Sequence, residues 1–158
     1  MADVRGYAFP DDLRYDADLN VWFRDLEGGQ DGGLLEAGLT AFGLALVGEL
    51  YMFNPRPVGR DIEAGRAFAL IEVAKTVLSV RTPFACQIAE INEPLTESPT
   101  RINRQPFESW LVRLKVPNLS DAHALLLQGS AVVTRAVELM ELNQMDVLAD
   151  GQHGQRAS

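Results

Sequence analysis

The segment that decides the fold reads Ala67-Phe68-Ala69-Leu70-Ile71-Glu72-Val73-Ala74-Lys75-Thr76-Val77-Leu78-Ser79-Val80. Two structures fit it. In a helix, Glu72 and Lys75 would form a charged pair three residues apart. Two strands are favoured by the β-branched side chains of the segment and by the flanking Gly65 and Pro83. We therefore expect two strands joined by a turn, although the Asn-Gly pair typical of a tight hairpin is missing.

Lys75 stands alone in this apolar segment, and the chain has only two lysines beside twelve arginines. A guanidinium stays protonated and is a poor nucleophile, whereas a lysine amine can lose its proton and form an amide. Lys75 is therefore a candidate site of acylation. The alternative interpretation is an ordinary solvated surface lysine.

Length and composition indicate a globular protein. A chain of 158 residues is most simply one domain, which we expect to cover residues 1–147, with a flexible tail over 148–158. The hydrophobic fraction of 47% and the charged fraction of 23% are ordinary for such a protein. A net charge of −8 argues against nucleic acid as a partner, because nucleic acid requires a basic footprint.

The sequence offers little for metal binding, catalysis or membrane insertion. Cys86 is the only cysteine, and His123 and His153 lack the spacing of metal ligands. No nucleophile–base pair or carboxylate dyad stands out, so we expect no active site. The longest apolar stretch, 39–53, is shorter than the roughly 20 residues of a membrane helix. We expect a cytoplasmic protein that does not enter membranes.

The remaining chain reads as short strands with helices at the margins. Strands are predicted at 21–24, 48–53 and 110–115, and another between two tight turns within 58–65. A short helix is expected at 41–46 after Thr40, an irregular segment at 92–104, and helix over about 119–147 with a break at Gly129-Ser130. The fold class is therefore mostly β, with short helices and a C-terminal helical segment.

A longer pattern surrounds Lys75. It consists of Val58-Gly59, Ala64-Gly65, Glu72-Val73-Ala74-Lys75, Thr82-Pro83, Glu90-Ile91-Asn92-Glu93, Ser98-Pro99, Ile102-Asn103 and Trp110-Leu111-Val112-Arg113-Leu114-Lys115. The order of these segments resembles the lipoyl-bearing part of the glycine cleavage system H-protein family. The resemblance extends over residues 5 to about 145. It implies a barrel-sandwich hybrid, with the lipoyl hairpin core at about 58–115.

The resemblance also implies a cofactor and its site. Lipoate would be amide-linked to Lys75 at the tip of a hairpin, and Glu72 would be the residue recognised by the lipoate ligase or lipoyl transferase. A simple exposed strand charge is the alternative interpretation of Glu72. Gly59 and Gly65 are expected to form turns rather than to contact a ligand.

The family's activity is that of a non-catalytic carrier with a swinging arm. A lipoamide arm on Lys75 would shuttle an aminomethyl group and reducing equivalents among three glycine-cleavage partners. These are a pyridoxal-phosphate decarboxylase, a folate-dependent transferase and dihydrolipoyl dehydrogenase. The cofactor would carry the chemistry, while the protein would supply its position.

Several residues depart from the family pattern. Asn20-Val21-Trp22 replaces a His-Glu-Trp sequence, Val73 replaces the serine after the motif glutamate, and Cys86 replaces a hairpin glycine. Some of these positions could touch a partner or the loaded arm, so the departures favour a specialised paralogue. Trp22 and Trp110 are expected in the core rather than at a partner interface.

Three other functions remain open. The opening Val4-Arg5-Gly6-x-x-Phe9-Pro10-x-Asp12-Leu13-x-Tyr15 is similar to lipoate-binding proteins linked to sulfur oxidation. In that version, the arm on Lys75 would carry sulfur intermediates for a heterodisulfide-reductase-like complex. A biotin carrier also bears its modified lysine at the tip of a hairpin. That lysine usually lies between methionines, however, and here Ala74 and Thr76 flank Lys75. An unlipoylated interaction protein would have kept the fold and lost the arm.

Overall fold

The computed structural model describes residues 2–27 and 32–152, with the side chains of the last helix described as far as Asn143. The strands are β1 (Ala2–Val4), β2 (Tyr7–Phe9), β3 (Arg14–Asp16), β4 (Val21–Leu26), β5 (Gly33–Leu39), β6 (Met52–Pro55), β7 (Asp61–Ile62), β8 (Ala67–Val73), β9 (Thr76–Arg81), β10 (Cys86–Ile91) and β11 (Val112–Val116). The helices are α1 (Ala41–Val47), α2 (Pro94–Glu97), α3 (Thr100–Arg104), α4 (Leu119–Ala124) and α5 (Ser130–Gln152).

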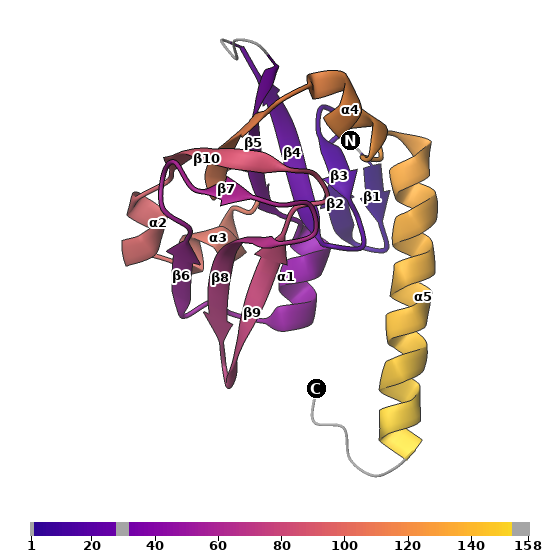
Figure 1. The fold of residues 1–158 in the computed structure, drawn as a ribbon. Helices are drawn as coiled ribbons and strands as arrows, with labels where there is room; N and C mark the ends of the chain where they lie inside the picture. Colours follow the sequence, from indigo (N-terminus) through magenta and orange to yellow (C-terminus); the bar gives the residue numbers. More distant parts are fainter. Residues whose placement is uncertain (1, 28–31, 153–158) are drawn as a thin grey trace.

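The described strands form three sheets (Figure 1). A six-stranded sheet has the order β3-β4-β5-β11-β10-β7, a three-stranded sheet has the order β6-β8-β9, and β1 pairs with β2. Pairing is antiparallel in all three sheets. The fold is therefore mostly β, with short helices and a C-terminal helix, as the sequence predicts.

Strand β4 separates two hydrophobic clusters. Successive side chains of a strand point to opposite faces of its sheet. Val21 and Phe23 accordingly enter the larger cluster, which lies between the six-stranded and three-stranded sheets. Trp22 enters a second cluster with residues of β1, β2 and β3, and Ala136 and Met140 of α5 cover it. Trp22 is thus a core residue, as expected.

Two segments differ from the sequence-based expectation. The strand predicted at 48–53 begins only at Met52 and ends at Pro55. Proline is tolerated there because β6 is an edge strand of its sheet. The segment 92–104, predicted to be irregular, forms α2 and α3. Pro94 is the first residue of α2, where its missing N–H costs no helical hydrogen bond.

The C-terminal part of the chain is helical, as predicted. Asn118 caps α4 by accepting a hydrogen bond from the Asp121 backbone N–H. Gly129, with φ of 64°, breaks the helical segment before α5. Helix α5 continues to Gln152 and so includes the first part of the predicted tail 148–158, whereas residues 153–158 lie outside the described residues.

Candidate functional site

Lys75 lies at the tip of a hairpin formed by β8 and β9. Val73 pairs with Thr76, so the connecting loop has only two residues, Ala74 and Lys75. Both are exposed, and the tip points away from the rest of the protein (Figure 1). The two predicted strands are confirmed, and the helical alternative for residues 67–80 is wrong.

The conformation of this loop explains the missing Asn-Gly signal. In the described chain, the non-glycine residues with positive φ are Arg5 and Asn20, so Ala74 and Lys75 both have negative φ. The primed turns that favour Asn-Gly require positive φ in at least one of the two loop residues. The hairpin therefore closes through a turn open to ordinary L-residues, and a lysine fits there without backbone strain.

The surroundings of Lys75 leave its amine accessible. Among the described residues, its side chain makes no hydrogen bond or ion pair. Glu72 is half-buried and lies between Met52 on β6 and Val77 on β9. Met52 and Val77 are 43% and 56% exposed. The hairpin thus presents one lysine, one carboxylate and two exposed apolar side chains.

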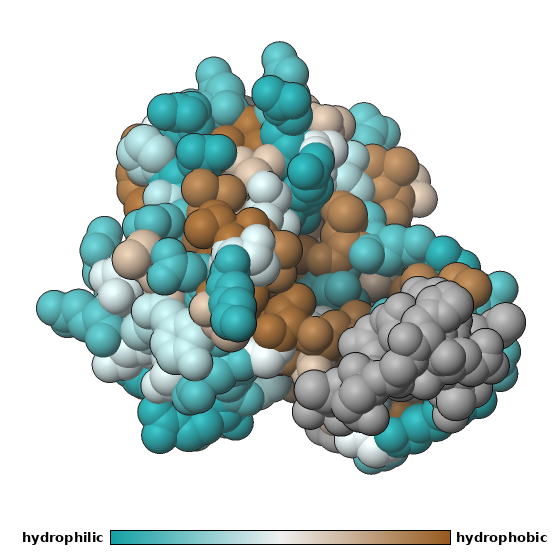
Figure 2. Space-filling model, turned by 90° about the horizontal axis from the view of Figure 1, so that it is seen from below, coloured by the Kyte–Doolittle hydropathy of each residue, from teal (hydrophilic) through white to brown (hydrophobic). Residues whose placement is uncertain are grey.

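A groove of about 450 Å³ runs beside the edge strand β9, against α1. It is lined by Leu19, Asn20, Leu39, Gly43, Val47, Ile71, Val77, Leu78, Ser79, Val80 and Arg81. Figure 2 views the molecule from the side toward which the hairpin points in Figure 1, and it shows hydrophobic side chains gathered around a hollow on that side. Val77 begins the groove two residues after Lys75, so the groove is within reach of a group carried on the hairpin tip.

Other residues of the family pattern hold loops rather than the hairpin tip. The Asn103 side chain accepts a hydrogen bond from the Leu50 N–H (2.9 Å) and donates one to the Gly48 carbonyl (2.9 Å). Asn92 Nδ2 donates to the Trp110 carbonyl (2.8 Å). These contacts fix the segment before β6 and the segment before β11, so both asparagines are structural.

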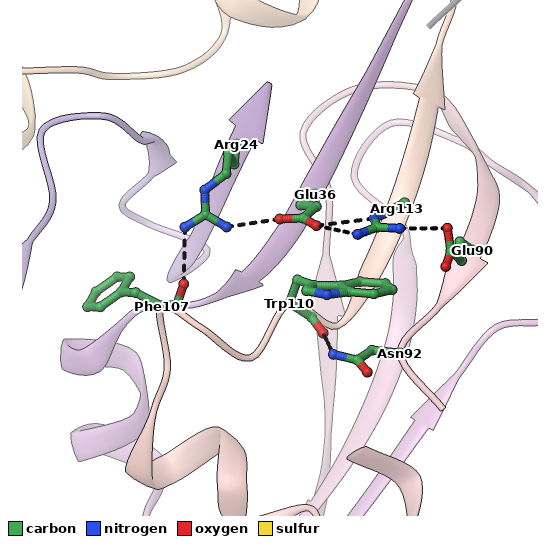
Figure 3. A network of polar contacts seen from close by, with 7 residues as sticks. All are labelled: Arg24, Glu36, Glu90, Asn92, Phe107, Trp110 and Arg113. Carbon is green, nitrogen blue, oxygen red and sulfur yellow. Dashed lines mark hydrogen bonds and ion pairs between the residues drawn. The ribbon is translucent and has the colours of Figure 1, made fainter. Parts of the chain in front are cut away.

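Sequence reasoning missed the polar network around Glu36 (Figure 3). The buried Glu36 accepts a hydrogen bond from Arg24 Nη1 (2.9 Å) and two from Arg113, through Nε (3.1 Å) and Nη2 (2.9 Å). Arg113 also binds Glu90 (2.8 Å) and lies 4.1 Å from the ring centroid of Trp110. The sequence feature that could have indicated this network is Glu36 itself, a single carboxylate within the apolar segment of β5. Trp110, expected in the core, is half-buried and packs against the edge of the second cluster.

Gly59 and Gly65 are confirmed as turn formers, with φ of 91° and 82°. No heavy atom lies within 4 Å of a Cβ placed on either residue, so conformation rather than space requires glycine. Cys86 does not occupy a turn: it begins β10 opposite Ile62 and is buried. Burial raises the pKa of its thiol to about 12, which makes it an unreactive cysteine at neutral pH.

Within residues 2–27 and 32–152, no group of three or more potential ligands among His, Cys, Asp and Glu is placed to hold a metal ion. In the same part of the chain, no helix combines the length and apolar character needed to cross a membrane.

The comparisons with known proteins agree with this geometry. A family model described as "Glycine cleavage H-protein" matches residues 13–138. The chain belongs to the glycine cleavage H-protein family. It is 30% identical over 146 residues to "Glycine cleavage system H protein 5" of Aquifex aeolicus, covering 89% of this chain and 93% of the relative. It is 35% identical over 118 residues to a glycine cleavage system H protein of Chlorobaculum tepidum, covering 74% and 89%.

The solved structures include a glycine cleavage system H protein from Mycobacterium marinum with a TM-score of 0.66 and 25% identity. That match covers 80% of this chain and 98% of the neighbour. The predicted family and the predicted barrel-sandwich fold class are therefore confirmed. Membership of the family supports the role of a non-catalytic lipoyl carrier and implies glycine-cleavage enzymes as partners.

Proposed function

We propose that this chain is a lipoyl carrier in which lipoate forms an amide with Nζ of Lys75. The observation that carries the proposal is the position of Lys75 in an exposed two-residue loop without a side-chain partner among the described residues. A modifying enzyme can reach such an amine without unfolding the hairpin. The groove that begins at Val77 has both apolar and polar lining residues, and its apolar side chains would contact the aliphatic part of the group.

The protein would position the cofactor rather than react itself. When bound, lipoate would supply a disulfide that two thiols of a partner reduce to a dithiol by thiol–disulfide exchange, the partner thiols being oxidised to a disulfide. Acylation would remove the positive charge of Lys75, so its modified side chain could enter the groove without burying an ammonium. The paired strands β8 and β9 hold the attachment point away from the sheets, and tethering raises the local concentration at each docked partner.

Glu72 would guide the lipoate ligase or lipoyl transferase. Its carboxylate lies three residues before Lys75 and makes no side-chain hydrogen bond or ion pair with the described residues. Met52 and Val77 flank it with exposed apolar surface. A charge between two apolar side chains is the arrangement by which an enzyme could select this hairpin and orient its lysine.

Intact-mass measurement after co-expression with a lipoate ligase tests the attachment site. The wild-type chain should gain the mass of one lipoyl group, and Lys75→Arg should gain none. Lys115→Arg is the matched control, because Lys115 is the other lysine and is also exposed. A modified Lys75→Arg protein, or an unmodified wild type, would contradict the proposal and favour an unlipoylated interaction protein.

Residues 1–147 would act as one carrier domain with the glycine-cleavage decarboxylase, folate-dependent transferase and dihydrolipoyl dehydrogenase. Release of carbon dioxide from glycine by the decarboxylase should increase when the lipoylated protein is added. The opening residues similar to the sulfur-oxidation branch, 4–15, extend from β1 to β3, and most of them precede the matched span 13–138. No stimulation by fully lipoylated protein would therefore favour a heterodisulfide-reductase-like partner.

A further inference from the structure

Four arginines meet at the base of the hairpin, at the opposite end of β8 and β9 from Lys75. They are Arg56, Arg60, Arg66 and Arg81. They line a pocket of about 470 Å³ that also includes parts of β7, β8 and β9. Six strand residues rise roughly 20 Å, so this pocket is separate from the hairpin tip.

The arginines of this pocket differ from most others of the described chain in their lack of carboxylate partners. Carboxylates pair with Arg5, Arg14, Arg24, Arg113 and Arg135. In the part of the chain that the structure describes, none of the four pocket arginines forms an ion pair, and Arg81 only donates to the Gly65 carbonyl (3.3 Å). The chain has 22 acidic residues and 14 basic ones, so a shortage of carboxylates does not explain why these arginines form no ion pairs. The pocket instead gathers guanidinium groups whose hydrogen-bond donors remain available.

We propose that this arginine pocket binds a small polyanion, a molecule carrying two or more phosphate or carboxylate groups. A guanidinium donates two parallel hydrogen bonds to such a group, and several of them around a concavity can hold more than one anionic group. The volume lies within the range of roughly 300–1,000 Å³ that is usual for small-molecule pockets. The site is distinct from Lys75, although Ser79 and Arg81 also line the groove beside β9, and it adds a ligand to the proposed carrier function.

Two carboxylates also line the pocket and oppose the arginines. Asp61 accepts a hydrogen bond from Gln87 (3.3 Å), whereas the exposed Glu63 side chain has no hydrogen-bond or ion-pair partner among the described residues. With four positive and two negative side chains, the pocket keeps a surplus of two positive charges. Glu63 must repel an anion, so its removal should strengthen binding while removal of an arginine weakens it.

Calorimetric titration of the unlipoylated full-length chain with pyrophosphate, at low ionic strength, tests the site. Citrate is the second probe and separates phosphate from carboxylate chemistry. We expect saturable binding of at least one of them at one site. Arg56→Gln and Arg81→Gln should each weaken it about tenfold, and Glu63→Gln should tighten it severalfold. Arg101→Gln is the matched control, because Arg101 on α3 is exposed and has no carboxylate partner among the described residues.

The result that overturns the proposal is the absence of saturable binding of both probes, or an equal loss in Arg101→Gln. Tighter binding of a hexaglutamate peptide than of either probe would also overturn it, because the surface would then accept an acidic protein segment. Circular dichroism of each variant checks the fold. Since the titration uses unmodified protein, its outcome is independent of whether Lys75 carries lipoate.

Discussion

Two glutamates on strands, Glu36 at the centre of the six-stranded sheet and Glu72 in the hairpin, have opposite surroundings. Glu36 is buried and accepts three hydrogen bonds from Arg24 and Arg113. Glu72 is half-buried and has no side-chain partner among the described residues. The Glu36 side chain is fixed by arginines from two other strands, whereas the Glu72 side chain is placed only by the backbone pairing of its strand. Substitutions should therefore affect stability in the first region and modification in the second.

The largest expected loss of stability follows from Glu36→Gln. The substitution removes the charge that Arg24 and Arg113 share, so we expect the free energy of unfolding to fall by about 2–3 kcal/mol. Urea denaturation measures this loss. Glu72→Gln, the matched change in the hairpin, should alter it by less than about 0.5 kcal/mol. Equal losses in the two variants would abolish the distinction between the regions.

A second test uses Cys86, which lies in the same sheet as Glu36. Burial raises the pKa of its thiol from 9.0 to about 12 in the folded state. This contribution to stability is complete below pH 9 and is lost as pH rises through 12. Between pH 9 and 11, the loss of this contribution should lower the free energy of unfolding by about 2 kcal/mol. Urea denaturation of wild type and Cys86→Ala at these pH values should show a smaller pH dependence in the variant; identical slopes would contradict the assignment.

A third test moves to the base of the hairpin. Gly65 has a positive φ, and a Cβ added to it would meet open space, so Gly65→Ala should cost about 1 kcal/mol through backbone strain alone. Gly65→Asn should recover part of this, since asparagine tolerates positive φ better. Thermal denaturation distinguishes the two variants. If asparagine were no better than alanine, the loss would have a cause other than φ.

The smallest effect is expected for Glu72→Gln, in which the lipoate ligase should recognise the hairpin less well. The ligase should show a KM raised severalfold with little change in kcat, because the carboxylate would contribute to recognition rather than to the acylation step. The control is Glu97→Gln, an exposed glutamate on α2, which should behave as wild type. Unchanged kinetics for both variants would identify Glu72 as an ordinary strand charge.

The hairpin was predictable because its determinants are local. β-branched side chains favour strands, and Gly65 and Pro83 mark the ends of the segment. The Glu36 network could not be predicted in this way, because Arg24 and Arg113 are 12 and 77 residues away from Glu36 in the chain. Helices α2 and α3 were missed because a proline that interrupts a strand pattern can equally begin a helix.

The two-residue loop at Lys75 also limits how this carrier can evolve or be engineered. Along β9, buried Val80 alternates with exposed Ser79 and Arg81. If insertion of one residue between β8 and β9 shifted the pairing register by one, it would exchange these faces, placing a guanidinium in the core and a valine in water. The loop can therefore change in sequence, and a change in its length is tolerated only where it keeps the register of β8 and β9. Relocation of the proposed acceptor lysine along a strand of the hairpin, with its side chain kept on the same face, should proceed in steps of two residues.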